Sequence, residues 1–117
     1  MNPAVIDAFA LAIVASEGPP AYPGLQGHDP DQASARRNAG RVGAAMAELK
    51  KVVPDTGSYV AESSFFEADW QKSYWGANYP RLLEIKKKYD PSGLFFAHHG
   101  VGGEGWSADG FTRISGR

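Results

Sequence analysis

Glu62 is the residue whose neighbours could prepare it for chemistry. It ends a short segment, residues 58–62, that is typical of a strand, and three aromatic residues follow closely: Phe65, Phe66 and Trp70. A carboxylate held among aromatic rings loses hydration, which raises its pKa and suits it to act as a general base near neutral pH. The alternative is a carboxylate at a strand end that simply faces solvent.

Two elements precede this segment and would help to position it. Phe9, Leu11 and Ile13 alternate with small or polar residues, and a period of two predicts a strand with one buried face, with an alanine-rich helix as the alternative. A helix is then expected from Asp29, which can cap it, to about Lys51. Its apolar face has helical spacing. That face comprises Val42, Ala45, Met46, Leu49 and Val53.

Two helices are expected after the short strand. The first covers residues 67–75 and ends at Gly76, with a stripe of rings spaced by four. That stripe consists of Phe66, Trp70 and Tyr74. The second is capped by Asn78, has Pro80 in its first turn and ends at residues 90–93. Its predicted buried ridge is Leu82, Ile85 and Tyr89. The Asp109-Gly110 pair predicts the turn of a small terminal hairpin.

Composition narrows the classes of function. At 117 residues the chain is expected to form one compact unit, and its 12 basic and 13 acidic residues are nearly balanced, so nothing indicates a nucleic-acid or membrane partner. The absence of cysteine excludes disulfides, thiolate metal sites and a cysteine nucleophile. His98 and His99 are adjacent and would point to opposite faces of a strand, so no metal site is predicted.

Several motifs, in a fixed order, resemble one enzyme family. They are the strings YVAE, DWQ, YWGANYPRL and IKKKYDP, followed by Phe95 and by GVGGEGW at residues 100–106. This order is similar to the C-terminal segment of the berberine-bridge-enzyme-like oxidases, which are FAD-linked oxidoreductases of the vanillyl-alcohol oxidase superfamily. The last string resembles the fungal members. The likeness covers about residues 54–106 and is weaker over residues 2–49, where Asn2-Pro3-Ala4 resembles the start of a late strand of the substrate domain.

The resemblance implies a particular place for this chain in a larger enzyme. Residues 1–56 would supply a partial substrate-domain strand and helix, and residues 57–117 the berberine-bridge-type segment. In the family, FAD is held mainly by an N-terminal domain through a glycine-rich loop and covalent links to histidine and often cysteine. The resemblance therefore implies that the FAD-binding domain lies on a part outside this sequence or on a separate chain, and that the isolated chain is inactive.

The resemblance also implies roles for four residues. Glu62 would be the catalytic base and Tyr59 would orient the substrate, while Asn78 and Tyr79 would lie against the FAD. The implied substrate is an alcohol, a sugar or a related small organic molecule, with oxygen as a possible acceptor, and the full-length family members are expected to be secreted. Ala61 is a departure, because many members have asparagine there and a methyl group cannot donate that hydrogen bond.

The fold expected from these elements is α+β, with an antiparallel sheet covered by helices on one face. The function expected is that of the C-terminal part of a flavin-dependent oxidoreductase. An alternative from another class is a non-catalytic interaction module or truncated remnant whose exposed aromatic surface docks a partner.

Overall fold

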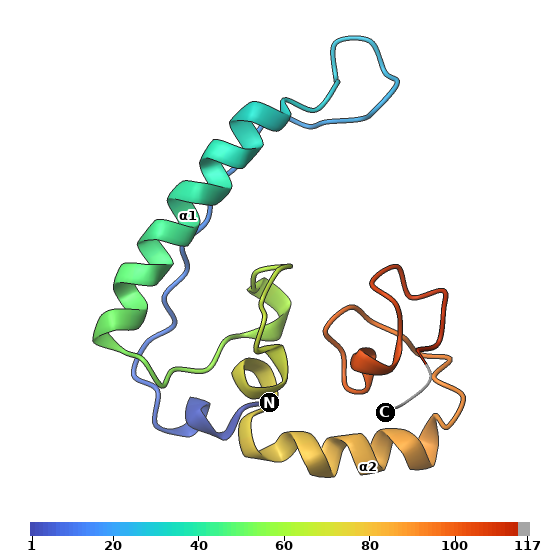
Figure 1. The fold of residues 1–117 in the computed structure, drawn as a ribbon. Helices are drawn as coiled ribbons and strands as arrows, with labels where there is room; N and C mark the ends of the chain where they lie inside the picture. The colour runs from blue at the N-terminus through green and yellow to red at the C-terminus, as the bar shows by residue number, and fades with distance from the viewer. Residues whose placement is uncertain (115–117) are drawn as a thin grey trace. The chain divides into compact units, whose positions relative to one another are not determined.

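The computed structural model describes residues 1–114, so the last three residues of the predicted 57–117 segment lie outside it. Contacts divide the chain into two units. Unit 1 joins Met1–Phe9 to the segment from Gly57 onward, and unit 2 is Ala10–Thr56. The structure thus groups the first nine residues with the C-terminal segment, whereas the sequence suggested a division at residue 56. Figure 1 shows the two main helices, α1 (Gln32–Val52) in unit 2 and α2 (Tyr79–Tyr89) in unit 1.

The predicted antiparallel sheet is wrong for this chain. Residues 1–114 form helices, turns and irregular segments, and their only β pairing is an isolated antiparallel bridge between Trp106 and Arg113. Residues 58–62 tighten into the 3-10 helix η2 (Val60–Glu62), where the Glu62 N–H donates to the Tyr59 carbonyl at 3.1 Å. The physical reason is that a lone extended segment leaves its backbone groups without partners, which a local turn supplies.

The other two predicted β elements are the strand around residues 9–13 and the terminal hairpin, and only the turn of the hairpin is found in residues 1–114. The alternating run after Phe9 is irregular backbone with exposed side chains, and the short 3-10 helix η1 (Pro3–Ile6) precedes it. The turn at Asp109-Gly110 is confirmed, since the Gly110 N–H donates to the Ser107 carbonyl at 2.8 Å and Gly110 has a φ of 75°. The hairpin around it is no longer than the single bridge.

Helix α1 of unit 2 forms as predicted, but with a different cap. The Asp31 side chain, and not that of Asp29, accepts the Ser34 N–H at 2.9 Å, so the helix begins at Gln32. One face of α1 is half-buried through Val42, Met46 and Leu49, and none of its residues is fully buried. Along the described chain no helix has the length and apolar content needed to cross a membrane.

Unit 1 is built on a change of helical type. The helix predicted over residues 67–75 is reduced to a π-helical turn, η3 (Gln71–Trp75). It ends at Gly76 as predicted, and the φ of 53° there suits glycine. The 3-10 turn η4 (Gly76–Asn78) follows and leads into α2, with Pro80 in its first turn. The type of helix thus changes twice within a few residues. Trp75 ends η3, Asn78 ends η4 and Tyr79 begins α2.

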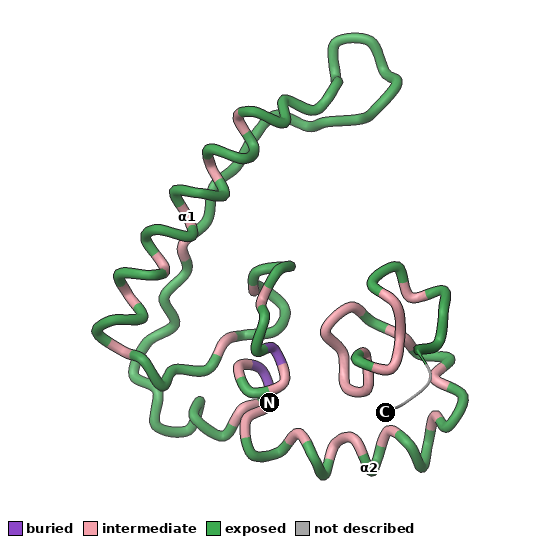
Figure 2. The backbone as a smooth tube through the Cα atoms, in the orientation of Figure 1, coloured by how far each residue is buried: buried purple, intermediate pink, exposed green. Residues whose placement is uncertain are grey.

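The core of unit 1 is small. Trp70 and Tyr74, at 8% and 2% exposure, are the only buried hydrophobic residues of the described chain. Figure 2 draws the buried part of the backbone in purple, within the turns that precede α2. Phe66 is 85% exposed, so the predicted stripe of three rings is reduced to two. The predicted ridge of α2 is also wrong in part. Leu82 is half-buried, but Ile85 and Tyr89 are exposed, and Leu83 and Lys86 complete the half-buried face.

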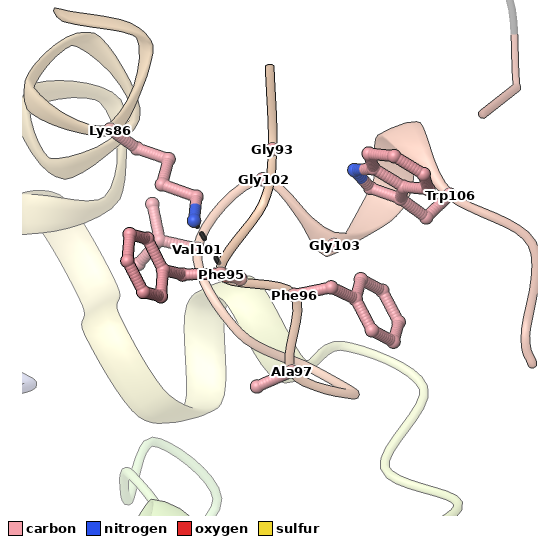
Figure 3. A pocket seen from close by; sticks show the side chains of 9 residues that line it. All are labelled: Lys86, Gly93, Phe95, Phe96, Ala97, Val101, Gly102, Gly103 and Trp106. Atoms are coloured by element: carbon pink, nitrogen blue, oxygen red, sulfur yellow. Dashed lines mark hydrogen bonds between the residues drawn. The ribbon is translucent and has the colours of Figure 1, made fainter. Parts of the chain in front are cut away.

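The Lys86–Asp90 ion pair closes the end of α2. Figure 3 shows Lys86 reaching the backbone at Phe95, whose carbonyl it contacts at 2.6 Å. The Asp90 carboxylate accepts from Lys86 Nζ and from the N–H groups of Leu94 and Phe95. The hydrogen bond from Lys86, joined by those of the backbone, holds the pKa of Asp90 below its usual value although desolvation acts the other way. The ion pair therefore ends the helix and fixes the chain beyond it.

The loops beyond α2 are packed through glycine. A Cβ atom at Gly93 would lie 2.6 Å from the Trp106 ring, and one at Gly110 would lie 2.4 Å from the Phe96 ring. Figure 3 shows Gly93, Phe96 and Trp106 among the residues that line a space of about 10 Å³. Because such a volume holds at most one water molecule, this is a packing seam and not a ligand site.

Candidate functional site

Glu62 and Tyr59 flank one 3-10 turn at the surface of unit 1. Glu62 is exposed, and Tyr59 is about half exposed. Phe65 and Phe66 are themselves 62% and 85% exposed, so these rings do not bury the Glu62 carboxylate within this chain. The geometry leaves the carboxylate open to a substrate or to a covering surface.

A pair of histidines lies beside this turn. The His98 ring stacks on Phe65 with centroids 4.0 Å apart, and the His99 ring stacks on Trp70 at 5.5 Å. The two imidazoles are 3.9 Å apart. They occupy a turn in which the Gly100 N–H donates to the Ala97 carbonyl at 2.8 Å, so the strand geometry used to dismiss a metal site does not hold. Residues 1–114 nevertheless contain no cluster of three or more potential metal ligands.

His99 has an uncommon backbone conformation. Its φ of 57° lies in the left-handed region, which few residues other than glycine adopt, although Asn, Asp and His do so more often than the rest. Stacking on the buried Trp70 ring holds it there. Burial lowers the pKa of His99, the positive field of His98 lowers it further, and Glu67 opposes the shift. The neutral imidazole is therefore the form that this site favours.

The histidine turn borders an open hollow of about 190 Å³. Its lining residues are Val60, Ser63, Ser64, Phe65, Tyr74, His98 and His99. Val60 belongs to the same turn as Glu62, so the hollow adjoins the predicted base. The sequence did not predict that the two histidines line a hollow. The only signal was a His-His pair directly before a glycine and shortly after two phenylalanines.

Tyr79 is tied down by its hydroxyl group. This group donates to the Glu104 carboxylate at 2.5 Å and accepts the Gly102 N–H at 3.3 Å. The Tyr79 ring meets Trp70 edge-on, with centroids 5.5 Å apart. Burial, together with the hydrogen bond to Glu104, raises the pKa of Tyr79 far above its ordinary value, so the hydroxyl stays protonated. Glu104 is thus a partner that the sequence did not reveal.

Asn78 stands at the cap position of α2 but does not cap it through its side chain, which corrects that prediction. Its Nδ2 instead donates to the Met1 carbonyl at 3.0 Å, and the residue is exposed. Three residues earlier in sequence, the Trp75 indole Nε1 is buried, and residues 1–114 offer it no hydrogen-bond partner. Asn78 and Tyr79 therefore lie together with an orphaned donor, while Glu62 and Tyr59 lie on the separate η2 turn.

The stability of unit 1 is expected to depend on pH through His99. Because its folded pKa is lowered, the unfolded chain binds the proton first as pH falls below about 6.5, the ordinary histidine value. Stability of unit 1 should thus be full above that pH and should decline on acidification until the folded pKa is passed. All three tryptophans lie in unit 1, so their fluorescence in a urea titration at each pH measures this change.

The matched variant for this prediction is His99→Asn, because asparagine tolerates the left-handed backbone and does not titrate. It should flatten the decline just below pH 6.5. His28→Asn, in unit 2, serves as the control and should keep the decline. An unchanged pH profile in His99→Asn would contradict the assignment.

Comparison with known proteins shows which family this segment is similar to. Residues 58–102 match the family model described as berberine and berberine-like. An uncharacterized FAD-linked oxidoreductase of Arthroderma benhamiae is 45% identical over 65 residues, covering 56% of this chain and 11% of that protein. The FAD-linked oxidoreductase easE of Aspergillus fumigatus is 49% identical over 65 residues, or 55% of this chain and 10% of that protein. A VAO-type flavoprotein oxidase of Thermothelomyces thermophilus is 39% identical over 66 residues, or 56% and 12%.

These three fungal relatives are flavin-linked oxidoreductases by name, so the resemblance seen in the motif order is confirmed. The match to the family model covers residues 58–102, less than half of this chain of 117 residues. The chain spans about a tenth of the length of the curated relatives that it matches. No solved structure matches it.

Proposed function

We propose that this chain is the C-terminal part of a flavin-dependent oxidoreductase that oxidises an alcohol, a sugar or a related small organic molecule. The observation that carries the proposal is the match of residues 58–102 to the berberine-like family, together with relatives that are all named for FAD or flavin linkage. An FAD-binding domain, on another part of a longer protein or on a separate chain, would complete the enzyme.

The residues at the start of α2 fit a flavin in part. Asn78 has an exposed side-chain amide whose oxygen can accept a hydrogen bond. The buried Trp75 Nε1 is a donor that lacks a partner within the described residues, as expected for a group whose partner is supplied from elsewhere. Tyr79 fits only through its ring, because its hydroxyl is bound to Glu104 and Gly102.

The roles proposed for the η2 turn follow from its exposure. Glu62 takes the proton from the substrate hydroxyl as the neighbouring carbon loses a hydride, and the substrate becomes a carbonyl compound. Tyr59, half exposed on the other side of the turn, donates a hydrogen bond that orients the substrate oxygen. A bound FAD would supply the acceptor for this hydride, with oxygen as a possible final acceptor.

A partner domain that covers the η2 turn would change the surroundings of the Glu62 carboxylate. The exposed rings of Phe65 and Phe66 follow Glu62 by three and four residues, and a domain placed over this stretch would remove water from the carboxylate as well. Loss of hydration makes a carboxylate a stronger base. The carboxylate would then become effective only in the assembled enzyme, which agrees with the inactivity expected of the isolated chain.

Exposed aromatic side chains also favour a second candidate function. Phe9, Phe66 and Phe111, all in unit 1, are exposed by 85% or more. Large exposed rings are typical of surfaces that dock a partner, and a non-catalytic interaction module would use them in the same way.

Reconstitution separates the two candidates. The chain is mixed with a polypeptide that carries the FAD-binding domain of a berberine-like oxidase, and oxygen uptake is followed over a panel of alcohols and sugars. The enzyme proposal expects uptake only when both polypeptides are present. Binding of the two without any oxygen uptake, with flavin bound and every substrate class tried, would favour the interaction module.

A further inference from the structure

Asn2 makes a dense set of contacts for a residue so near the beginning of the chain. Its Nδ2 donates to the carbonyl groups of Lys72 at 3.1 Å and Ser73 at 2.9 Å, and its Oδ1 accepts the Ala4 N–H at 3.1 Å. Both amide protons and one acceptor site are thus used. The two carbonyl groups belong to the π-helical turn, some 70 residues away in sequence.

The Asn2 side chain lies between two glycines. A Cβ atom built on Gly57 would be 2.6 Å from Asn2 Nδ2, and one built on Gly76 would be 2.6 Å from Oδ1. Gly76 also has a φ of 53°, so no other residue fits there without strain. The niche therefore has room for an asparagine side chain only because both walls lack side chains.

The chemistry of the niche selects asparagine over its nearest analogues. Aspartate has the same shape, but it has no donor and would place a charge opposite two carbonyl oxygens. Alanine would leave the Lys72 carbonyl without this partner, while Ser73 would keep the Ser58 N–H at 2.8 Å. Glutamine is longer by one methylene, for which the glycine walls leave little space.

We propose that Asn2 is a positioning residue for Asn78. By fixing the first residues of the chain on the π-helical turn, Asn2 places the Met1 carbonyl where it accepts from Asn78 Nδ2 at 3.0 Å. This bond orients the Asn78 amide and so selects the group that its oxygen faces. That this group is the flavin rests on the proposed function; the positioning itself does not.

The test is Asn2→Asp in the full chain, without any flavin. Asn38→Asp, on α1 of unit 2, introduces the same charge and serves as the control. The readouts are the NMR signals of the Asn78 side-chain amide and the thermal unfolding midpoint from tryptophan fluorescence. Asn2→Asp should move the Asn78 amide signals to the shifts of an unstructured asparagine while unit 1 remains folded, and Asn38→Asp should leave them in place. Unmoved Asn78 signals in folded Asn2→Asp protein would overturn the proposal.

A second pair of variants applies if Asn2→Asp does not fold. Gly57→Ala is expected to lower the midpoint strongly in the presence of Asn2, because its Cβ collides with Nδ2, and clearly less in an Asn2→Ala background. Equal losses in both backgrounds would show that the niche does not hold Asn2, and the proposal would fail. Neither experiment contains flavin, so failure of the proposed oxidase activity would not affect them.

Discussion

Glutamine in place of Glu62 is expected to lower the turnover of the reconstituted oxidase by about 10² or more. Glutamine keeps the size and the acceptor oxygen of the side chain but cannot take a proton. Since the proposed role concerns the chemical step, kcat should fall while substrate affinity changes little. The measurement is steady-state oxygen uptake at saturating substrate, with kcat and KM determined separately.

The control for Glu62→Gln is Glu84→Gln. Glu84 is an exposed carboxylate on α2 that pairs with Lys87 at 3.0 Å, and its side chain is 72% exposed. A surface pair of this kind contributes little, so turnover should be unchanged. If both variants retain full turnover, Glu62 is not the base.

Replacing Trp70 with alanine is expected to destabilise unit 1 by about 3–5 kcal/mol, the usual range for a buried aromatic residue. The loss is large relative to the total, because Trp70 and Tyr74 are the only buried hydrophobic residues in the described chain. Trp70 also supports the rings of Tyr79 and His99. The variant should therefore lose cooperative unfolding altogether, as followed by the fluorescence of the two remaining tryptophans.

Phe66→Ala is the matched control for Trp70→Ala, since it removes a large ring that is 85% exposed. Substitution of an exposed side chain usually changes stability by less than about 0.5 kcal/mol. Equal destabilisation by the two variants would mean that the core of unit 1 is not centred on Trp70.

Local signals in the sequence predicted the local structure well. The two long helices, the stop at Gly76, the place of Pro80 in the first turn of α2 and the turn at Asp109-Gly110 each depend on residues within a few positions of one another. Capping was less well predicted, because Asp29 and Asp31 both suit a cap and only the geometry selects Asp31. The family resemblance held because it used several motifs in order.

Features that depend on distant contacts could not be predicted. An alternating pattern indicates a strand only if another strand pairs with it, and residues 1–114 provide no such partner for residues 9–13 or 58–62. The Asn2 niche joins residues about 70 positions apart, and the left-handed backbone of His99 is stabilised by stacking on Trp70. Neither leaves a periodic pattern in the sequence.

We propose that this chain completes a hydride-transfer site around a flavin carried by another part of the enzyme. The most direct measurement is the visible absorbance of that flavin, recorded without air, as substrate is added in the presence and absence of this chain. The account predicts that substrate bleaches the flavin only when the chain is present, and more slowly with Glu62→Gln. Equal bleaching without the chain would contradict it.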